Sequence, residues 1–178
     1  MSFILAFAGS NSSTSINFEL VKHTGSLIIS EKVEIMNMYD RPFPMYSEDH
    51  EREHGYSNSL NEIKRDIQLS KGIIISVNEH NSYPSAYFKN LIDWLSRLDR
   101  DFIRDKKVML MATSNGGRGA IGALEVTDKL LTRFGANIVA TFSLSRYKEN
   151  FKVDEGILNS DLAEQHQSLL NNFLKAIQ

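Results

Sequence analysis

Residues 3–17 read FILAFAGSNSSTSIN, and this stretch decides the fold. Its first six residues are apolar, which is typical of a strand buried on both faces of a parallel sheet. A glycine and a run of hydroxyl side chains follow and end at Ser15, a residue type that favours the start of a helix. A buried strand that passes through a short polar turn into a helix is the repeating unit of an α/β sheet.

The same succession recurs along the chain. Apolar runs predict strands at Phe3–Ala8, Val33–Met38, Gly72–Val77, Lys107–Ala112 and Asn137–Leu144. Apolar residues at helical spacing predict helices over Ser15–Ile28, Ser57–Ser70, Ser85–Arg97, Gly119–Phe134 and Asp161–Ile177. Two connections stand out: Tyr39–Ser57, polar and with two of its residues proline, is expected to be a loop, and the charged stretch Leu98–Lys106 is expected to be exposed.

Strict alternation of buried strands and helices predicts one parallel sheet with helices on both faces. Because crossovers between parallel strands are right-handed, few topologies remain, and the strand order 2-1-3-4-5 is the common one for five strands. We expect residues 1–178 to form a single domain, since a chain of this length favours one and no linker or repeat interrupts it.

The composition excludes several classes of function. The chain has 42% hydrophobic and 24% charged residues, as ordinary globular proteins do. Its net charge of −2 gives no basic surplus for a phosphate backbone, so we expect no nucleic-acid partner. Cysteine is absent, which excludes disulfides, thiolate metal sites and thiol catalysis. No apolar run approaches the roughly 18 residues of a membrane span, and no basic segment opens a signal peptide, so we expect a cytoplasmic location.

Ligands of such sheets bind beyond the carboxyl ends of the strands, where the strand order reverses. Three segments at those ends are rich in small and polar residues: residues 9–17, residues 78–84 and residues 113–119. The first is a candidate phosphate cradle, because a helix start offers free N–H groups and a positive dipole end, to which hydroxyls add further donors. It matches neither the dinucleotide fingerprint nor the Walker loop, and a serine-rich turn with a helix cap is the alternative.

The three segments resemble those of the NADPH-dependent FMN reductases, a flavodoxin-like family with quinone, chromate and azo-dye reductases among its relatives. Members carry Gly-Ser-x-Arg-x-x-Ser-x-Asn after the first strand, which corresponds to residues 9–17. They carry Pro-Glu-Tyr-Asn after the third strand and a Leu-Lys-Asn-Ala-Ile-Asp-Trp helix, which here read NEHN at 78–81 and FKNLIDW at 88–94. A serine and a Gly-Gly turn follow the fourth strand, as in residues 114–117.

The resemblance implies a flavodoxin-like fold and an FMN site. The residues that would hold the phosphate are Ser10, Ser12, Ser15, Ile16 and Asn17. Those along the isoalloxazine ring would be Asn78, Glu79, His80 and Asn81, and those at its other edge Ser114, Gly116 and Gly117. It further implies an oxidoreductase in which NADPH or NADH passes hydride through the flavin to a quinone or another small acceptor. The protein positions the flavin, so no catalytic acid or base is assigned. A homodimer or tetramer is expected, because the family's flavin lies beside a subunit interface.

Two departures from the family pattern keep alternatives open. Ser12 replaces the arginine and so removes a charge-assisted phosphate contact, and His80 replaces the tyrosine. One alternative is a flavodoxin-like electron carrier without turnover of its own, although a net charge of −2 is mild for a carrier. The other is a protein that has lost FMN and acts through protein contacts.

Other motifs have plainer interpretations. His50-Glu51-Arg52-Glu53-His54 matches a zinc-protease pattern, but no further ligand pattern follows, so a solvated loop or short helical turn is expected. Trp94 and the apolar stripe that includes Phe88 and Leu91 are expected to pack in the core. The alternating Arg and Asp residues between 97 and 105 are expected to form a solvated face.

Overall fold

The computed structural model describes residues 3–178. Five parallel strands form the sheet: β1 (Ile4–Ala8), β2 (Val33–Met36), β3 (Gly72–Val77), β6 (Lys107–Thr113) and β7 (Asn137–Leu144). Their order is β2-β1-β3-β6-β7, which confirms the predicted order 2-1-3-4-5. Two further pairs of two-residue strands form hairpins, β4 (Glu79–His80) with β5 (Tyr83–Pro84) and β8 (Phe151–Lys152) with β9 (Gly156–Ile157).

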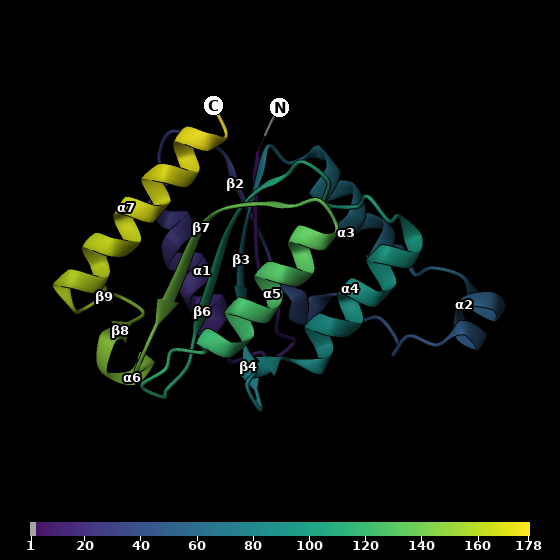
Figure 1. Cartoon of the computed structure of the whole chain (residues 1–178), viewed down its shortest axis with the longest axis horizontal. Coiled ribbons are helices and arrows are strands. Elements are labelled where there is room, and N and C mark those ends of the chain that lie inside the picture. Colours follow the sequence, from purple (N-terminus) through teal and green to yellow (C-terminus); the bar gives the residue numbers. More distant parts are fainter. Residues whose placement is uncertain (1–2) are drawn as a thin grey trace.

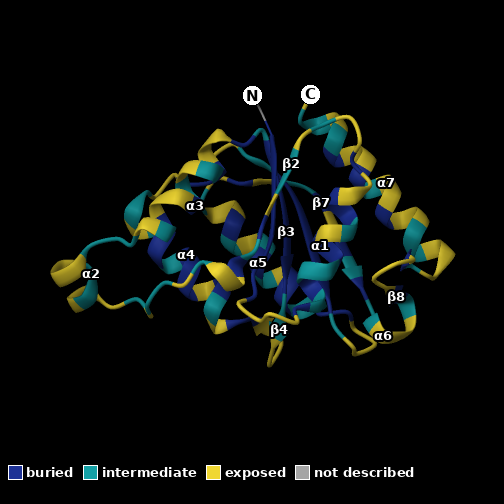
Figure 2. Ribbon diagram, turned by 180° about the vertical axis from the view of Figure 1, so that it is seen from behind, coloured by how far each residue is buried: buried dark blue, intermediate teal, exposed yellow. Residues whose placement is uncertain are grey.

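Helices cover both faces of the sheet (Figure 1). One core lies under α3 (Asn58–Leu69), α4 (Ala86–Leu98) and α5 (Ile121–Arg133). The other lies under α1 (Ile16–Ser26) and α7 (Ser160–Ala176). Strands β1, β3 and β6 are buried along almost their whole length (Figure 2), as their continuous apolar runs predict.

The helices begin where the sequence places a small polar residue. Ser15, Ser57, Ser85 and Asn159 each accept a backbone N–H from the third residue of the helix that follows. Such caps satisfy donors that a helix start leaves free. The residues predicted to pack in the core are confirmed as well: Phe88, Leu91 and Trp94 are fully buried.

Two predicted connections differ from the structure. Tyr39–Ser57 is not structureless, because it begins within the 3-10 turn η1 (Met38–Asp40) and contains the helix α2 (Glu48–His54). The strand before it ends at Met36, two residues earlier than predicted. We call residues 37–57 the arm, since they carry α2 away from the body (Figure 1). Leu98–Lys106 is only partly exposed: Phe102 and Ile103 are each 1% exposed. These two apolar residues, set among charges, turn inward at the end of the sheet opposite the candidate site.

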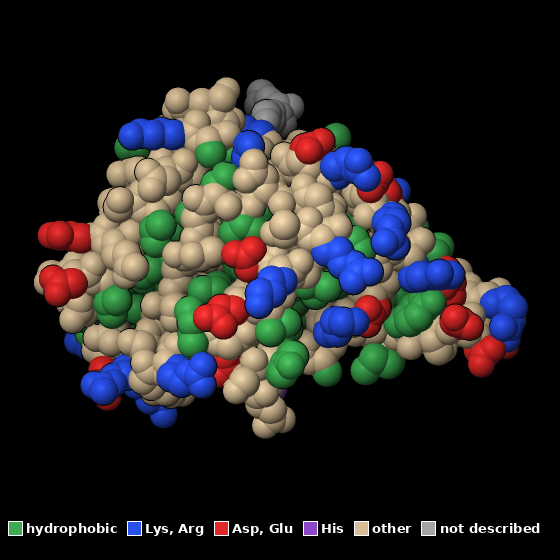
Figure 3. Space-filling model, in the orientation of Figure 1, with side chains coloured by type: hydrophobic (Ala, Val, Ile, Leu, Met, Phe, Trp, Pro, Cys, Tyr) green, Lys and Arg blue, Asp and Glu red, His purple; other side chains and the backbone are tan. Residues whose placement is uncertain are grey.

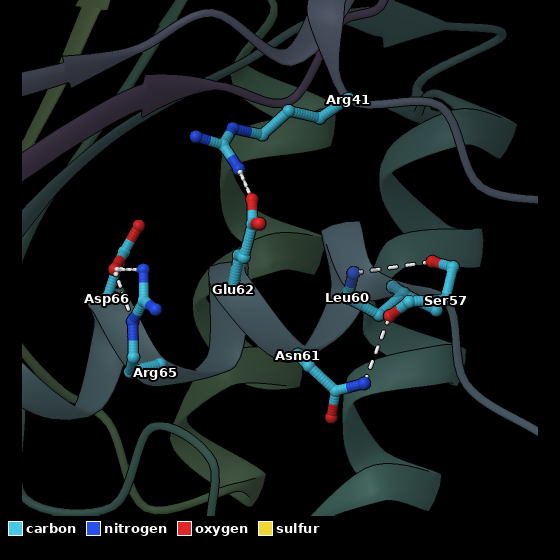
Figure 4. Close-up of polar contacts among 7 residues, drawn as sticks. All are labelled: Arg41, Ser57, Leu60, Asn61, Glu62, Arg65 and Asp66. Atoms are coloured by element: carbon cyan, nitrogen blue, oxygen red, sulfur yellow. Dashed lines mark hydrogen bonds and ion pairs between the residues drawn. The ribbon is translucent and has the colours of Figure 1, made fainter.

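The base of the arm is tied to α3. Arg41 donates to Glu62 at 2.6 Å, while Ser57 caps the helix by accepting the N–H of Leu60 at 3.4 Å (Figure 4). The side-chain amide of Asn61 donates to the Ser57 carbonyl at 3.1 Å. Both ends of the arm are therefore held against one helix, and α2 projects between them.

The segment after β7 was not predicted. It contains the short helix α6 (Tyr147–Asn150) and the β8–β9 hairpin, which lead into α7. Backbone N–H groups of Arg146 and Tyr147 donate to the carbonyls of Gly116 and Ser114, each at 3.0 Å. The start of α6 therefore supports the glycine turn at the carboxyl end of β6.

Candidate functional site

The loop after β1 presents hydroxyl groups at the start of α1. Ser10 and Ser15 are nearly buried, and residues 11–14 are exposed. The Ser10 hydroxyl accepts the N–H of Ser12 at 3.3 Å, and the Ser15 hydroxyl accepts that of Phe18 at 3.2 Å. Because each of these oxygens acts as an acceptor, its own proton remains available to donate. Within residues 3–178, the N–H groups of Ile16 and Asn17 have no protein acceptor.

The Asn17 side chain joins three strand ends. Its Oδ1 accepts the Ser76 hydroxyl at 2.7 Å and the Thr113 N–H at 3.0 Å, while its Nδ2 donates to the Thr113 carbonyl at 3.2 Å. The residue is 2% exposed, so these bonds are screened from water. Only the backbone of Asn17 is therefore free for a ligand. Its side chain brings the loops after β1, β3 and β6 together at one edge of the sheet, which we call the rim.

The segment after β3 is a hairpin rather than a plain loop. Asn81 and Ser82 form its two-residue turn with φ of 53° and 66°, a left-handed conformation that asparagine tolerates well. Before the hairpin, Asn78 places its Oδ1 out of contact with solvent and without a hydrogen-bond partner. Its Nδ2 lies 3.2 Å from His80 Nε2. An orphaned acceptor at this rim fits a ligand that brings an N–H donor.

Glu79 takes a role that sequence reasoning missed. Its Oε2 accepts the N–H of Ala123 at 3.0 Å and so caps α5, whose own preceding residue, Ala120, offers no side-chain cap. A Cβ at Gly122 would lie 2.7 Å from the Ser82 carbonyl oxygen, so only glycine permits this close approach. The carboxylate at the positive end of α5 fixes the hairpin on the helix. No local sequence pattern predicts this cap, because Glu79 and Ala123 are 44 positions apart in the chain.

The glycine turn after β6 is open. A Cβ added at Gly116 would have Ser114 Oγ as its nearest neighbour at 3.7 Å, and one at Gly117 would have Arg146 Nε at 3.8 Å. Both glycines are exposed, and Ser114 is half-buried. A flat ligand can approach the backbone here. Arg146, in turn, is a cation beside the turn that sequence reasoning did not identify.

Residues 88–94, the helical part of the family resemblance, contact the arm. Asn90 Oδ1 accepts the N–H of Tyr46 at 2.8 Å, and its Nδ2 donates to the Pro44 carbonyl at 2.9 Å. The Trp94 indole N–H donates to the same carbonyl at 2.7 Å. The asparagine and tryptophan of this helix therefore anchor the arm, and neither lies in the loops at the rim.

Glu51 fastens α2 to α4. It accepts hydrogen bonds from the hydroxyls of Tyr46 at 2.9 Å and Tyr56 at 2.7 Å, and from Arg97 at 3.0 and 3.2 Å. The Arg97 guanidinium, followed by the two hydroxyls, lowers the pKa of the Glu51 carboxyl. Burial and the hydrogen bond to Glu51 raise the pKa of both tyrosines.

The zinc-like motif in α2 forms a short helix, as predicted. His50 and His54 face each other with ring centroids 4.6 Å apart. Among residues 3–178, no group of three or more histidine or acidic side chains is placed to hold a metal ion. Glu51, the first glutamate of the motif, accepts hydrogen bonds from Tyr46, Tyr56 and Arg97, so its role is structural.

The residues at this rim fit FMN. Hydroxyl and N–H donors at a helix start suit a phosphate, and the orphaned Asn78 Oδ1 suits a ring N–H. The open space above Gly116 and Gly117 suits the edge of a flat ring. A flavodoxin-like sheet with this donor set at the reversal of its strand order defines a flavin-binding protein of the flavodoxin-like class.

The comparisons with known proteins agree with this class. The chain belongs to the NADPH-dependent FMN reductase family, whose model matches residues 3–149. It is therefore an NAD(P)H-dependent oxidoreductase that uses FMN. An uncharacterized Mycoplasma pneumoniae protein is 25% identical over 146 residues, covering 79% of this chain and 86% of that protein.

Two further relatives carry functional names. A quinone reductase of Escherichia coli is 32% identical over 73 residues, which are 41% of this chain and 39% of that enzyme. The structure is similar to that of FerB, an NAD(P)H:(acceptor) oxidoreductase of Paracoccus denitrificans, with a TM-score of 0.80 and 21% identity. That match covers 99% of this chain and 97% of the other and supports the fold. None of the helices within residues 3–178 is long and apolar enough to cross a membrane.

Proposed function

We propose that the rim formed by the loops after β1, β3 and β6 holds FMN and that the enzyme reduces a quinone-like small molecule. The Asn17 side chain is the observation that carries this proposal. Because its three hydrogen bonds join Ser76 and Thr113 to the start of α1, the serine loop, the hairpin and the glycine turn share one rim. A quinone acceptor is supported by the 32% identity to the quinone reductase.

The proposed assignment follows the donor set. The phosphate lies against the hydroxyls of Ser10, Ser12 and Ser15 and the N–H groups of Ile16 and Asn17. The ring lies along Asn78, Glu79, His80 and Asn81, with Ser114, Gly116 and Gly117 at its other edge. Glu79 positions the hairpin and does not bind the ring with its side chain, because its carboxylate accepts the N–H of Ala123 in α5.

When bound, FMN supplies the relay that accepts a hydride and passes electrons on. Overall, NAD(P)H gives up a hydride and becomes NAD(P)⁺, while the quinone gains two electrons and two protons and becomes a hydroquinone. The second proton comes from solvent. The chain contributes the orientation: donors hold the phosphate, and the hairpin is fixed by Glu79, so that one face of the ring stays open to both substrates in turn.

We propose in addition that residues 1–178 act as one FMN-binding domain in a homodimer, in the cytoplasm. The arm supports the dimer, because it carries exposed apolar side chains that its own chain leaves uncovered. Met45 is 69% exposed and Tyr39 is 55% exposed. Apolar surface that projects from a body is typical of a contact between subunits. The absence of cysteine fits a reducing compartment.

An FMN titration followed by anaerobic NADPH tests the proposal. Binding is expected to quench the flavin fluorescence, NADPH is expected to bleach the yellow colour, and a quinone is expected to restore it. Gly116→Val provides the site variant, since a Cβ at this exposed position would have Ser114 Oγ as its nearest neighbour at 3.7 Å, while the side chain would occupy the proposed ring position. It is expected to weaken FMN binding without lowering the melting temperature. Unquenched flavin with the wild type would refute the site, and flavin that binds but is not bleached would indicate an electron carrier.

A further inference from the structure

A cavity of about 650 Å³ lies beside the proposed flavin rim, between the β4–β5 hairpin, α4 and α5. Apolar side chains form much of its wall: Tyr83, Pro84, Ala86, Val126 and Leu130. His80 and Asn81, which the proposed function places along the flavin ring, line it as well. Its volume is that of a small-molecule site, and residues of the hairpin border both the cavity and the proposed ring position.

Three cations surround this apolar wall: Lys89, Lys129 and Arg133. Lys89 is paired with Asp93 at 2.5 Å. Lys129 and Arg133 lie one turn apart on α5 and are exposed. In the described chain, no carboxylate lies within 4 Å of either of them. Figure 3 shows Lys and Arg side chains gathered over α4 and α5 around hydrophobic surface.

Unpaired cations at the edge of an apolar cavity favour one kind of ligand. A planar apolar body would cover the wall formed by Val126, Leu130 and Pro84. An anionic group on that body would meet Lys129 and Arg133, and the guanidinium can hold a carboxylate or sulfonate with two parallel hydrogen bonds. A neutral ring would gain the apolar contact but not the charge pairing. Attraction between charges is also stronger at a partly dry surface than in bulk water.

We propose that this cavity is the acceptor subsite and that Lys129 and Arg133 select aromatic acceptors that carry a carboxylate or sulfonate. The inference rests on the proposed function, because His80 and Asn81 line this cavity and are also the residues that the proposed function places along the flavin ring. The reaction balance is that of the quinone given above, and the anionic group is not changed in it. Lys129 and Arg133 act on specificity and take no part in electron or proton transfer.

A matched pair of acceptors tests the proposal. Naphthoquinone and naphthoquinone sulfonate differ in one anionic group, and kcat/KM is measured for each with the wild type, Lys129→Gln and Arg133→Gln. Each substitution is expected to lower kcat/KM for the sulfonate about tenfold and for the neutral quinone less than about twofold. Lys175→Gln is the control, because it removes an exposed cation from α7 on the opposite face of the sheet. A ratio of the two kcat/KM values that is unchanged in both α5 variants would overturn the proposal.

A binding measurement without flavin separates a failure of the acceptor subsite from a failure of the proposed function. Anilinonaphthalene sulfonate, an anionic aromatic probe, is titrated into flavin-free protein by fluorescence. Its Kd is expected to rise about tenfold in Arg133→Gln and to stay unchanged in Lys175→Gln. Charge-dependent probe binding without NAD(P)H turnover would refute the proposed function and keep the anion site. Probe binding that disappears as protein concentration rises would show a second copy of the chain in the cavity and overturn the acceptor subsite.

Discussion

Asn17 and Thr113 are joined by two hydrogen bonds across the carboxyl edge of the sheet. The Thr113 N–H donates to Asn17 Oδ1 at 3.0 Å, and Asn17 Nδ2 donates to the Thr113 carbonyl at 3.2 Å. The pair ties the first residues of α1 to the end of β6, which are 96 positions apart. The rim is therefore preorganised before any ligand arrives, and this lowers the entropic cost of binding.

Asn17→Ala is expected to destabilise the protein by about 2–4 kcal/mol. The change removes three hydrogen bonds and leaves the Ser76 hydroxyl and the Thr113 N–H buried without partners, which costs more than the loss of a solvated bond. Urea unfolding measures the difference, and Asn171→Ala, at an exposed position of α7, is the matched control. A loss of unfolding free energy below about 1 kcal/mol would mean that water replaces the amide and that the Asn17 hydrogen bonds are not needed for stability.

Glu51→Gln is expected to loosen the arm. The amide cannot accept from Arg97, Tyr46 and Tyr56 as a carboxylate does, so α2 loses its charge-assisted contacts with α4. The single tryptophan, Trp94, reports this, because the rings of Tyr46 and Tyr56 pack edge-on against it at 5.1 and 5.9 Å. Acrylamide quenching of its fluorescence is expected to increase. Glu53→Gln, also in α2, serves as control, and equal quenching in both variants would contradict the role of Glu51.

His166 is expected to make stability depend on acid pH. Burial, followed by the nearby charge of His23, lowers the pKa of His166 to about 4. The unfolded chain binds this proton near pH 6.5 and the folded chain only near pH 4. The contribution of neutral His166 to the free energy of unfolding is therefore fully present above pH 6.5. It is lost as the pH falls toward 4, and the loss is about 3 kcal/mol.

Unfolding of wild type and His166→Gln between pH 7 and pH 4 measures this dependence. Glutamine keeps a polar group near Thr24, whose hydroxyl lies 2.9 Å from His166 Nε2, but it does not titrate. The variant is expected to lose most of the slope in this range. The lowered pKa of His23 contributes in the same direction and remains in the variant. Parallel curves for the two proteins would contradict the assignment to His166.

The features of the fold that depend on local periodicity, namely the strands, the helices and the core residues, could be predicted from the sequence. Continuous apolar runs in β1, β3 and β6 and the apolar stripe on α4 are long patterns, so the strands and the core could be predicted from them. The strand order followed from the handedness of the crossovers and the commonest arrangement of five strands. The same loops that the resemblance singled out form the rim. What was missed depends on contacts between distant segments. Glu79 caps a helix that begins far along the chain, and the arm is ordered by Asn90 and Trp94. His166 carried no signal, because only tertiary packing buries it.

Ser12→Arg is the sharpest test of the phosphate assignment. Ser12 is exposed, and its hydrogen bonds within residues 3–178 are to its neighbours Ser10 and Thr14, so an arginine there disturbs no packing. It restores the cation that the family pattern carries at this position. A charge-assisted hydrogen bond contributes about 1.5–3 kcal/mol, so the Kd for FMN is expected to fall roughly 10- to 150-fold.

The control for this variant is Ser13→Arg, which adds the same charge one exposed residue further along. A general electrostatic attraction would strengthen binding equally in both variants and would fade with salt. A directed contact would favour Ser12→Arg and leave riboflavin, which lacks the phosphate, unaffected. Because riboflavin and FMN share the ring, the difference between their affinities isolates the phosphate. If Ser12→Arg tightened both flavins alike, the loop after β1 would not be the phosphate site, and the FMN orientation proposed above would be wrong.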